Sequence, residues 1–296
     1  MSSPLVSVPV ITYNSANTIL ETLESIKEQT YLNIELIISD DCSTDSTVEL
    51  CREWIEKNKE RFVRVELLIV PQNTGVSANC NRAEAACRGE WIKGIAGDDI
   101  MLPNCISDNI DFIEEHPDAI YVWSRCKSFG MSEDRCAEMD AYYNYDFFSW
   151  TPQEQYDYLT LERNCIPAVS VVYNREKKEN LGIKNDERIP LLEDQPKWVN
   201  LIKMGVRLYF MDKLTVMYRL SSNGLFSSGK HLPEFQKSNA LFYLYYSFSN
   251  DIKKNPKRAL YRYLDMKALV TESIFLKIIA KIYKIGILHE SKYFRR

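Results

Sequence analysis

The chain has 296 residues and a mass of 34.5 kDa, a length that suits one large α/β domain with an appendage. Its net charge of −4 is unevenly spread, since residues 253–296 hold twelve Lys/Arg against three Asp/Glu (+9) and residues 1–252 carry −13. An acidic body argues against nucleic-acid binding, and a basic tail indicates contact with something anionic. The eight cysteines show no metal-finger spacing and no signal peptide is visible, so we expect reduced thiols in a cytoplasmic protein.

The first 125 residues alternate between strand and helix patterns. The expected strands are Val6–Ile11, Ile34–Ser39, Val65–Val70, Trp91–Ala96 and Ile120–Trp123. The expected helices are Asn17–Gln29, Ser43–Asn58, Val76–Cys87 and Leu102–Glu115. This βαβ order predicts an α/β fold with a doubly wound, mostly parallel sheet.

The second half of the chain is less regular. Residues 128–165 are polar and aromatic without clean periodicity, and the chain is helical from about Leu232 onward. Between these parts we expect strands at Ala168–Tyr173, Arg207–Phe210 and Leu214–Tyr218, and a helix at Leu192–Met204.

Two acidic clusters each follow a predicted buried strand. Asp40 and Asp41 come after one strand, and Asp98 and Asp99 come after another. Ligands of open α/β sheets bind at this edge, and neighbouring carboxylates repel unless a cation or hydrogen-bond donors offset them. A divalent ion bridging to phosphate oxygens would resolve this repulsion, which predicts a metal-assisted, nucleotide-handling enzyme. Taken singly, the first cluster is also explained in part by first-turn acids of a helix, a reading that suits Ser43 and Asp45 better than Asp40 and Asp41. The second is also explained by a turn before a helix, because Asp doublets are common in turns.

Two further sites have an ordinary explanation beside a functional one. Tyr13 follows the first strand and is able to stack on a flat base, although Asn14 or Asn17 also makes this segment a simple strand-to-helix turn. Glu193 and Asp194 open a helix, either as first-turn acids or with one of them as a general base.

Taken in order, a longer set of residues resembles a known family. The set comprises Val6–Val8, Thr12–Asn14, Leu23–Ile26, Gln29–Tyr31, Ile34–Asp45, Asn73–Ala78, Gly89–Ile92, Gly97–Asp99 and Pro103, with weaker echoes at Glu193–Asp194, Trp198 and Tyr218–Arg219. It resembles the inverting nucleotide-sugar glycosyltransferases of family 2, which have the GT-A fold, in their bacterial polysaccharide or O-antigen form. The match is specific over residues 1–125 and moderate to about 222.

The resemblance implies a division of the chain and a reaction. A GT-A catalytic domain would span residues 1–225, with a nucleotide-binding half (1–125) and an acceptor-binding half (126–225), followed by a basic helical region (226–296). The reaction would move a sugar from a UDP-sugar to a hydroxyl of a glycan acceptor, free or lipid-linked, with inversion and with Mn²⁺ or Mg²⁺. Oligomerisation stays open.

The resemblance also assigns residues. Asp98 would bind the metal, with Asp99 as its neighbour, and Asp194 would be the catalytic base. Tyr13 would border the base of the nucleotide and Asp41 would accept from uracil N3–H. The remaining nucleotide-binding residues implied by the match are Thr12, Asn14 and Asn73.

Three positions depart from the family pattern. The family often has Asp at the position of Ala96 and Arg at the position of Cys80. It often has His shortly after Tyr-Arg, where this chain has Ser221 and Ser222. The further metal ligand that this His would supply would then have to be His231. The departures at Ala96 and Cys80 keep a non-catalytic scaffold in a glycan-assembly complex as an alternative. A nucleotidyltransferase is the other alternative, although residues 12–16 lack the glycine or basic residue it usually needs.

The segment Lys267–Leu288 is amphipathic, with Lys277, Lys281 and Lys284 opposite an isoleucine-rich side. Because lysines interrupt every apolar run, a spanning helix is not expected. Either residues 253–296 hold the protein peripherally on the cytoplasmic face of an anionic membrane, or this helix packs on the body or on a second subunit.

Overall fold

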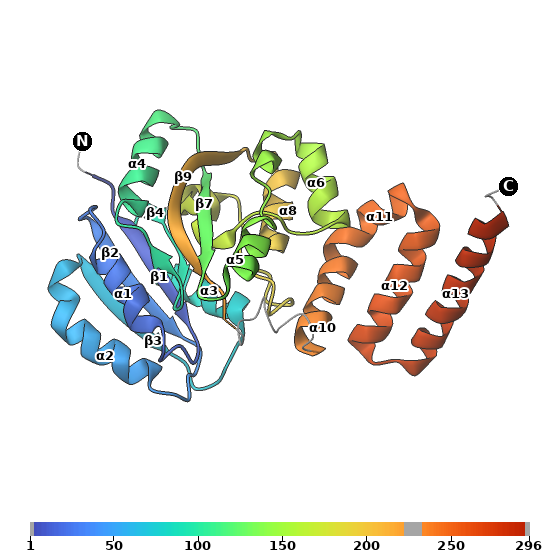
Figure 1. Ribbon diagram of the computed structural model, residues 1–296, viewed down its shortest axis with the longest axis horizontal. Helices are drawn as coiled ribbons and strands as arrows, with labels where there is room; N and C mark the ends of the chain where they lie inside the picture. The colour runs from blue at the N-terminus through green and yellow to red at the C-terminus, as the bar shows by residue number, and fades with distance from the viewer. Residues whose placement is uncertain (1–2, 222–232, 294–296) are drawn as a thin grey trace.

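A single sheet of nine strands organises the computed structural model, which describes residues 3–221 and 233–293 (Figure 1). The strands are β1 (Val6–Thr12), β2 (Ile34–Asp40), β3 (Arg64–Ile69), β4 (Trp91–Ile92), β5 (Ile95–Ala96), β6 (Ile100–Met101), β7 (Tyr121–Phe129), β8 (Val172–Asn174) and β9 (Leu208–Arg219). Their order is β3-β2-β1-β4-β8-β7-β9-β6, with β5 beside β1. Most pairings are parallel, and β8 and β6 run antiparallel to their neighbours. The predicted doubly wound, mostly parallel sheet is confirmed.

Helices cover both faces of this sheet. They are α1 (Ile19–Lys27), α2 (Thr47–Asn58), α3 (Val76–Ala86), α4 (Cys105–Glu115), α5 (Glu133–Asp140), α6 (Pro152–Leu161), α7 (Arg175–Asn180) and α8 (Gln195–Lys203). Strand β2 shows why the sheet is buried on both sides: Leu36 and Ile38 enter one core cluster, while Ile37 enters the other. A continuous apolar run, rather than an alternating one, is typical of such a strand.

Several elements differ from the sequence prediction. The strand expected at Trp91–Ala96 is divided into β4 and β5 at Lys93–Gly94, where the buried Lys93 ammonium donates to the carbonyls of Gly94 (3.0 Å) and Val169 (2.5 Å). The two strands expected at 207–218 form the one strand β9, which pairs with β7 through a register shift. Helices α5 and α6 lie in the segment 128–165, where no helix was expected.

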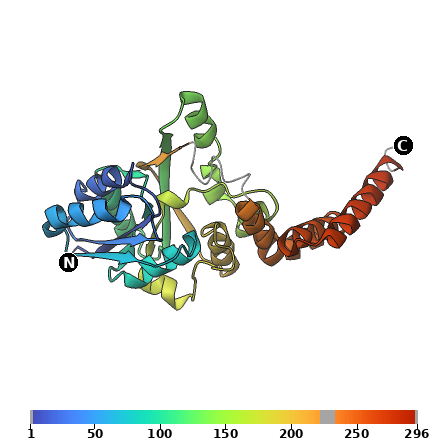
Figure 2. The same cartoon turned by 90° about the horizontal axis from the view of Figure 1, so that it is seen from below.

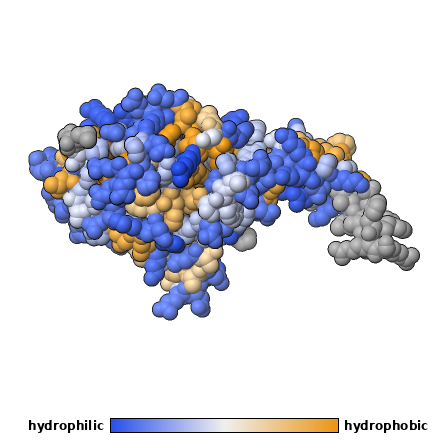
Figure 3. All heavy atoms as spheres, turned by 90° about the horizontal axis from the view of Figure 1, so that it is seen from above, coloured by the Kyte–Doolittle hydropathy of each residue, from blue (hydrophilic) through white to orange (hydrophobic). Residues whose placement is uncertain are grey.

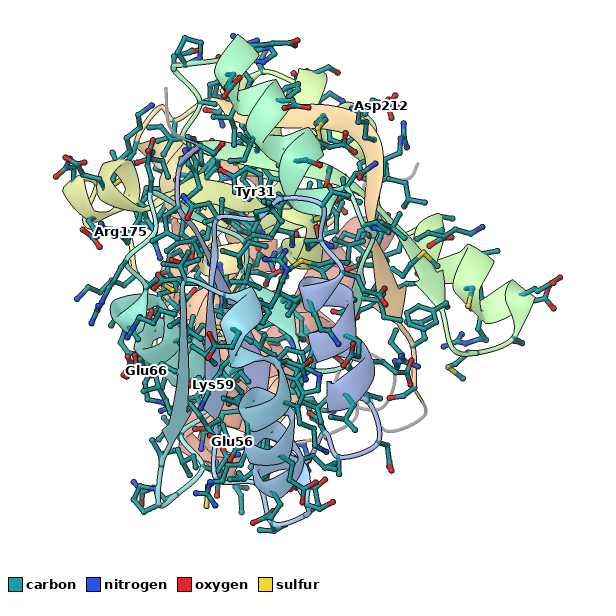
Figure 4. All side chains as sticks on the ribbon, turned by 90° about the vertical axis from the view of Figure 1, so that its left-hand side faces the viewer. Tyr31, Glu56, Lys59, Glu66, Arg175 and Asp212 are labelled. Atoms are coloured by element: carbon teal, nitrogen blue, oxygen red, sulfur yellow. The ribbon has the colours of Figure 1, made fainter. Side chains whose placement is uncertain are left out.

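The edge strand β3 and the outer helix α2 present charged side chains to solvent, as Figure 4 shows for Glu66, Glu56 and Lys59. Glu66 pairs with Arg64 on the same strand, and Glu56 pairs with Lys59 at 3.1 Å. Charge along an edge strand opposes pairing with another chain.

The C-terminal helices form an arm that extends away from the sheet (Figures 1 and 2). It contains α10 (Pro233–Phe242), a π-helical turn (Tyr243–Ser247), α11 (Phe248–Lys254), α12 (Pro256–Thr271) and α13 (Ile274–Tyr293). Asp251, which is fully buried, ties three of these elements together by accepting from Tyr243 (2.8 Å), Arg258 (2.7 Å) and Arg262 (3.2 Å). None of the described helices is both long and apolar enough to cross a membrane. The expected boundary at 225/226 lies outside the described residues and stays a prediction.

Candidate active site

The two acidic clusters meet at one edge of the sheet. Thr12 at the end of β1 is in register with Asp40 at the end of β2, and β5 ends beside β1 at Ala96. The backbone N–H of Gly97 donates to the carbonyl of Ile11 at 2.9 Å, which places the turn before Asp98 at this edge. Asp41 and Asp98, which are 57 positions apart in the chain, therefore open on the same side of the sheet.

Asn14 joins the loops that follow β1 and β2. Its backbone N–H donates to Ser43 Oγ (2.8 Å), and its Oδ1 accepts from the N–H of Thr44 (2.8 Å). Its φ of 51° lies in the left-handed region, which asparagine tolerates better than most residues. Tyr13 beside it is 49% exposed and presents its ring to solvent, while Thr12 Oγ1 is buried without a hydrogen-bond partner in the described part of the chain.

The Asp41 carboxylate is fully engaged within the protein. It accepts from the Thr74 N–H (2.9 Å) and Oγ1 (2.6 Å), the Gly75 N–H (2.8 Å) and Arg82 Nη2 (3.0 Å). A carboxylate offers about four acceptor positions, so these bonds occupy Asp41 and hold the loop before α3. Asn73, also in this loop, is exposed and its Oδ1 accepts from the Gly75 N–H at 3.1 Å.

Asp40, unlike Asp41, binds the loop that follows its own strand. Its Oδ1 accepts from the backbone N–H of Ser43 (2.8 Å), and its Oδ2 accepts from the Ser43 hydroxyl. Helix α2 begins only at Thr47, because Asp45 accepts from the N–H of Thr47 (3.0 Å) and fixes a non-helical turn before it. The predicted helix start at Ser43 is therefore four residues too early.

Asp98 and Asp99 form a desolvated acidic pair held by Arg219. The Arg219 backbone N–H donates to Asp99 Oδ1 (2.8 Å) and its Nε donates to the Asp98 carbonyl (2.7 Å). Burial raises the pKa of both carboxyls, and for Asp99 the charge of Asp98 raises it further. Among the described residues, Arg219 holds the backbone of Asp98 and not its carboxylate, so the oxygens of that side chain are available to a ligand.

The second acidic pair, Glu193 and Asp194, lies at the start of α8. The helix is fixed by Trp198, which is fully buried and packs edge-on against Trp123 at 4.8 Å between ring centres. Asp194 Oδ1 accepts from the N–H of Gln195 (2.6 Å), and its Oδ2 accepts from Asn164 Nδ2 (2.5 Å). Burial raises the pKa of Asp194, and burial together with the charge of Asp194 raises the pKa of Glu193 to about 7.

Tyr218 lies near residues of both acidic pairs. Its pKa is raised by burial and by the charges of Asp99, Asp98 and Glu193. An electrostatic effect from both pairs on one hydroxyl requires that both lie near it. The structure thus brings the Asp98–Asp99 and Glu193–Asp194 pairs to one site, although 95 positions separate Asp99 from Asp194 in the chain.

The donor set fits a divalent ion shared with a substrate. Within the described residues no group of three or more His, Cys, Asp or Glu side chains is arranged to hold a metal by itself. Asp98 offers a carboxylate whose charge is disfavoured by burial, and one or two carboxylates completed by substrate phosphates are typical of Mg²⁺. The suggested further ligand His231 lies outside the described residues, Ser221 lies at their margin, and Ala96 is exposed at the sheet edge without a donor group.

Sequence reasoning missed the cations that organise the site. Arg82 also donates to Ser39 Oγ (3.1 Å) and Asn79 Oδ1 (2.7 Å), so it is the centre of the network around Asp41. In the family pattern an arginine often occupies the position of Cys80, directly before Asn81. Arg82, directly after Asn81, could therefore have been noticed from the sequence as the arginine of this site. Arg219 was part of a weak match to the family at Tyr218–Arg219, and no role was assigned to it from the sequence.

The protein has the GT-A fold, because its structure aligns with solved structures of that fold. Residues 1–349 of TarS from S. aureus, in complex with UDP-GlcNAc, align with a TM-score of 0.62 at 19% identity over 90% of this chain and 81% of the TarS 1–349 chain. The mannosyltransferase PcManGT from Pyrobaculum calidifontis, in complex with GDP-Man and Mn²⁺, aligns with a TM-score of 0.58 at 17% identity over 97% of this chain and 81% of PcManGT. At these identities the likeness shows the fold alone.

Residues 7–177, more than half of the chain, match the family described as glycosyl transferase family 2, and the chain belongs to this family. It is 26% identical over 227 residues to the putative teichuronic acid biosynthesis glycosyltransferase TuaG of Bacillus subtilis (76% of this chain, 82% of TuaG). It is 28% identical over 237 residues to WfaP of Escherichia coli, a UDP-Glc:alpha-D-GlcNAc-diphosphoundecaprenol beta-1,3-glucosyltransferase (80% of this chain, 85% of WfaP). The protein is therefore a glycosyltransferase, and the nucleotidyltransferase alternative is set aside.

Proposed function

We propose that this protein transfers a sugar from a UDP-sugar to a hydroxyl of a bacterial surface glycan, with inversion at the anomeric carbon. The observation that supports this most is the presence of two acidic pairs, Asp98–Asp99 and Glu193–Asp194, whose pKa values burial raises and whose charges act on the same Tyr218 hydroxyl. One pair suits a metal-bound diphosphate and the other suits a general base, which are the two functions a single displacement needs. The activity stated in the name of WfaP supports UDP-glucose as a donor and a lipid diphosphate-linked acceptor as candidates.

Asp98 would hold a Mn²⁺ or Mg²⁺ ion, with Asp99 beside it, and the ion would offset the charge of the departing UDP. Asp194 in its deprotonated form accepts the proton of the acceptor hydroxyl. That hydroxyl attacks the anomeric carbon from the face opposite the bond to UDP, and the configuration inverts. Arg219 keeps the Asp98–Asp99 turn in place through its bonds to the Asp98 carbonyl and the Asp99 carboxylate.

UDP release is the direct test of this proposal. Purified protein is incubated with single UDP-sugars and a panel of candidate acceptors, including a GlcNAc-diphospholipid, in Mn²⁺, in Mg²⁺ or in EDTA. We expect UDP release that requires one donor, one acceptor and a divalent ion. No UDP release with any of these donors and acceptors would contradict the proposed use of a UDP-sugar.

For the nucleotide, we propose that Thr12, Tyr13, Asn14, Asp41, Asn73 and Asp99 surround the base, ribose and diphosphate. Tyr13 supports this by its exposed ring at the sheet edge. Asp41 has no free acceptor position, so uracil N3–H would bind it only by replacing one present donor. Arg82 is the best candidate for replacement, because its partly exposed side chain retains the bonds to Ser39 and Asn79.

If uracil N3–H replaces Arg82 as a donor to Asp41, substitutions at these two residues should affect UDP binding differently. Asp41→Asn should weaken UDP binding by about 1.5–3 kcal/mol, the value of a hydrogen bond to a charged group. Arg82→Met should leave UDP affinity unchanged or improve it, because it frees the position that uracil would use. Calorimetry with UDP measures both, and thermal unfolding checks that the loop before α3 is retained. Equal losses in the two variants would show that Asp41 acts on the loop and not on the base.

For the arm, we propose peripheral contact with an anionic membrane, where a lipid-linked acceptor would lie. Helix α13 turns Leu276, Ile279, Ala280 and Tyr283 away from solvent, but Ile274, Phe275, Ile278 and Ile282 are 73%, 70%, 52% and 64% exposed. Hydrophobic residues gather near the outer end of the arm in Figure 3. Lys277 and Lys281 are exposed beside this apolar strip, a combination that suits a surface with acyl chains and negative headgroups.

Co-sedimentation with phosphatidylglycerol-containing vesicles tests the membrane contact. Each lysine near an anionic surface contributes roughly 1 kcal/mol, so replacing Lys277, Lys281 and Lys284 by Gln should weaken binding about 100-fold. A matched variant that replaces the exposed lysines Lys57, Lys59 and Lys203 of the body should bind normally. Concentration-dependent dimerisation that is lost in Ile278→Ser, without vesicle binding by the intact protein, would assign the strip to a second copy of the chain.

A further inference from the structure

The loop that follows α6 makes one direct contact with the candidate base. Asn164 Nδ2 donates to Asp194 Oδ2 at 2.5 Å, and Asn164 Oδ1 accepts from the backbone N–H of Ile166 at 3.3 Å. An amide oxygen and nitrogen are distinguished by their partners, and a backbone N–H can only donate. The N–H of Ile166 therefore turns the oxygen of Asn164 toward itself and the NH₂ group toward Asp194.

Without Asn164 the Asp194 carboxylate would keep, of its two side-chain hydrogen bonds to the described residues, only the one from Gln195. Its other oxygen accepts from the N–H of Gln195, the first residue of α8, and one hydrogen bond leaves rotation about the Cβ–Cγ bond open. Two bonds to two different oxygens fix the plane of the carboxylate. Each oxygen then keeps a second acceptor position for a substrate proton.

We propose that Asn164 is a positioning residue that orients the Asp194 carboxylate toward the acceptor hydroxyl and keeps it ready to accept a proton. This inference rests on the proposed role of Asp194 as the base. Asn164 itself needs no contact with the sugar, because it acts through Asp194. A catalytic group such as a general base must be held within about 0.5 Å of its productive position.

The charged groups around Asp194 make the hydrogen bond from Asn164 important. Glu193 precedes Asp194, and Lys197 follows it one turn later on α8. Tyr142, in the segment before α6, lies near enough for the charge of Asp194 to raise its pKa. Arg163, beside Asn164, is occupied with the ring of Tyr142 at 4.0 Å and with the Tyr158 hydroxyl at 3.3 Å. Burial raises the pKa of Asp194, whereas the Gln195 N–H, Lys197 and Asn164 lower it. Removal of the Asn164 donor should therefore raise this pKa further and leave less of the deprotonated base at neutral pH.

The chain offers a substitution that separates positioning from loop structure. Asn164→Asp keeps an oxygen for the N–H of Ile166 but replaces the donor to Asp194 by a second carboxylate. Asn144→Asp is the matched control, because Asn144 Oδ1 accepts from the N–H two residues on, at Asp146 (3.1 Å), in the same segment of the chain. If the side chain at position 164 does not act on Asp194, both substitutions are tolerated equally, because the new carboxylate then has no effect on the pKa of Asp194.

The test combines a titration with kinetics. The ¹³Cγ resonance of Asp194, assigned by its loss in Asp194→Asn, is followed against pH in the free protein. The kcat is then measured against pH by UDP release, with the donor and acceptor that support turnover in the wild type. We expect Asn164→Asp to raise the titration midpoint of Asp194 by at least about one pH unit. Because only the deprotonated carboxylate is active, kcat at a pH below that midpoint should then fall roughly tenfold. Asn144→Asp should match the wild type in both measurements.

Two results would overturn the inference in different ways. If Asp194→Asn is inactive but Asn164→Asp titrates and turns over like Asn144→Asp, only the positioning role is wrong. If Asp194→Asn keeps full turnover, the assignment of the base fails, and the inference fails with it.

Discussion

Asp98→Asn is expected to abolish sugar transfer while the protein stays folded. The substitution keeps the shape of the side chain but removes the negative charge that would hold the divalent ion at the diphosphate of the donor. Loss of one preorganised electrostatic contact at a developing charge typically lowers kcat by about 10²–10³, and we expect at least this loss. UDP release at saturating Mn²⁺, compared with wild type, measures it.

The same variant should not lose stability. Burial raises the pKa of Asp98 and of Asp99, so the folded protein binds protons at this pair more tightly than the unfolded chain does. The contribution of the pair to folding stability therefore falls as pH rises through these pKa values. At pH 7 the Asp98→Asn variant, whose side chain is neutral, should melt at or above the temperature of the wild type, as differential scanning calorimetry will show.

A suitable control is the exposed Asp212, which pairs only with Arg125 among the described residues and is labelled in Figure 4. Asp212→Asn should retain both turnover and metal dependence. If Asp98→Asn turns over normally and still requires a metal, the ion is bound elsewhere. If it is inactive and also melts well below the wild type, the loss of activity does not report on metal binding.

Asp194→Asn is expected to lower kcat by about 10²–10⁴ with little change in the affinity for UDP-sugar. A general base acts on the acceptor in the transition state, so its removal lowers kcat without weakening donor binding. In the wild type, kcat should rise with pH as the Glu193–Asp194 pair loses its proton, because only the deprotonated carboxylate accepts one. Steady-state kinetics from about pH 5.5 to about pH 9, with calorimetry for the donor, separate these effects.

Glu193→Gln is the matched control for this experiment. Glu193 is adjacent and burial raises its pKa to about 7, so it is the main competitor for the role of base. We expect Glu193→Gln to keep most of its turnover and to lower the apparent pKa of Asp194, because a neighbouring negative charge is removed. The opposite pattern, a large loss in Glu193→Gln and a small one in Asp194→Asn, would exchange the two assignments. Equal loss of donor affinity in Asp194→Asn would instead make it a donor or metal contact.

The sheet and the position of the acidic clusters follow from local chain order. The runs that form β1 and β2 are mostly apolar and do not alternate strictly with polar residues, which is typical of a strand covered on both faces whatever its neighbours are. Asp40–Asp41 and Asp98–Asp99 follow predicted strands directly, so their place at the carboxyl edge could be predicted without knowledge of the packing. The family pattern added their expected chemistry.

The partners of those carboxylates depend on packing in three dimensions. Asp41 meets Arg82 from a neighbouring helix, Asp99 meets Arg219 from the end of β9, and Asp194 meets Asn164 from the loop after α6. No periodicity encodes such pairs, because they depend on how helices and strands pack and on which side chains reach across. The same reason applies to α13, whose apolar residues divide between α12 and solvent according to packing that hydrophobic spacing alone does not specify.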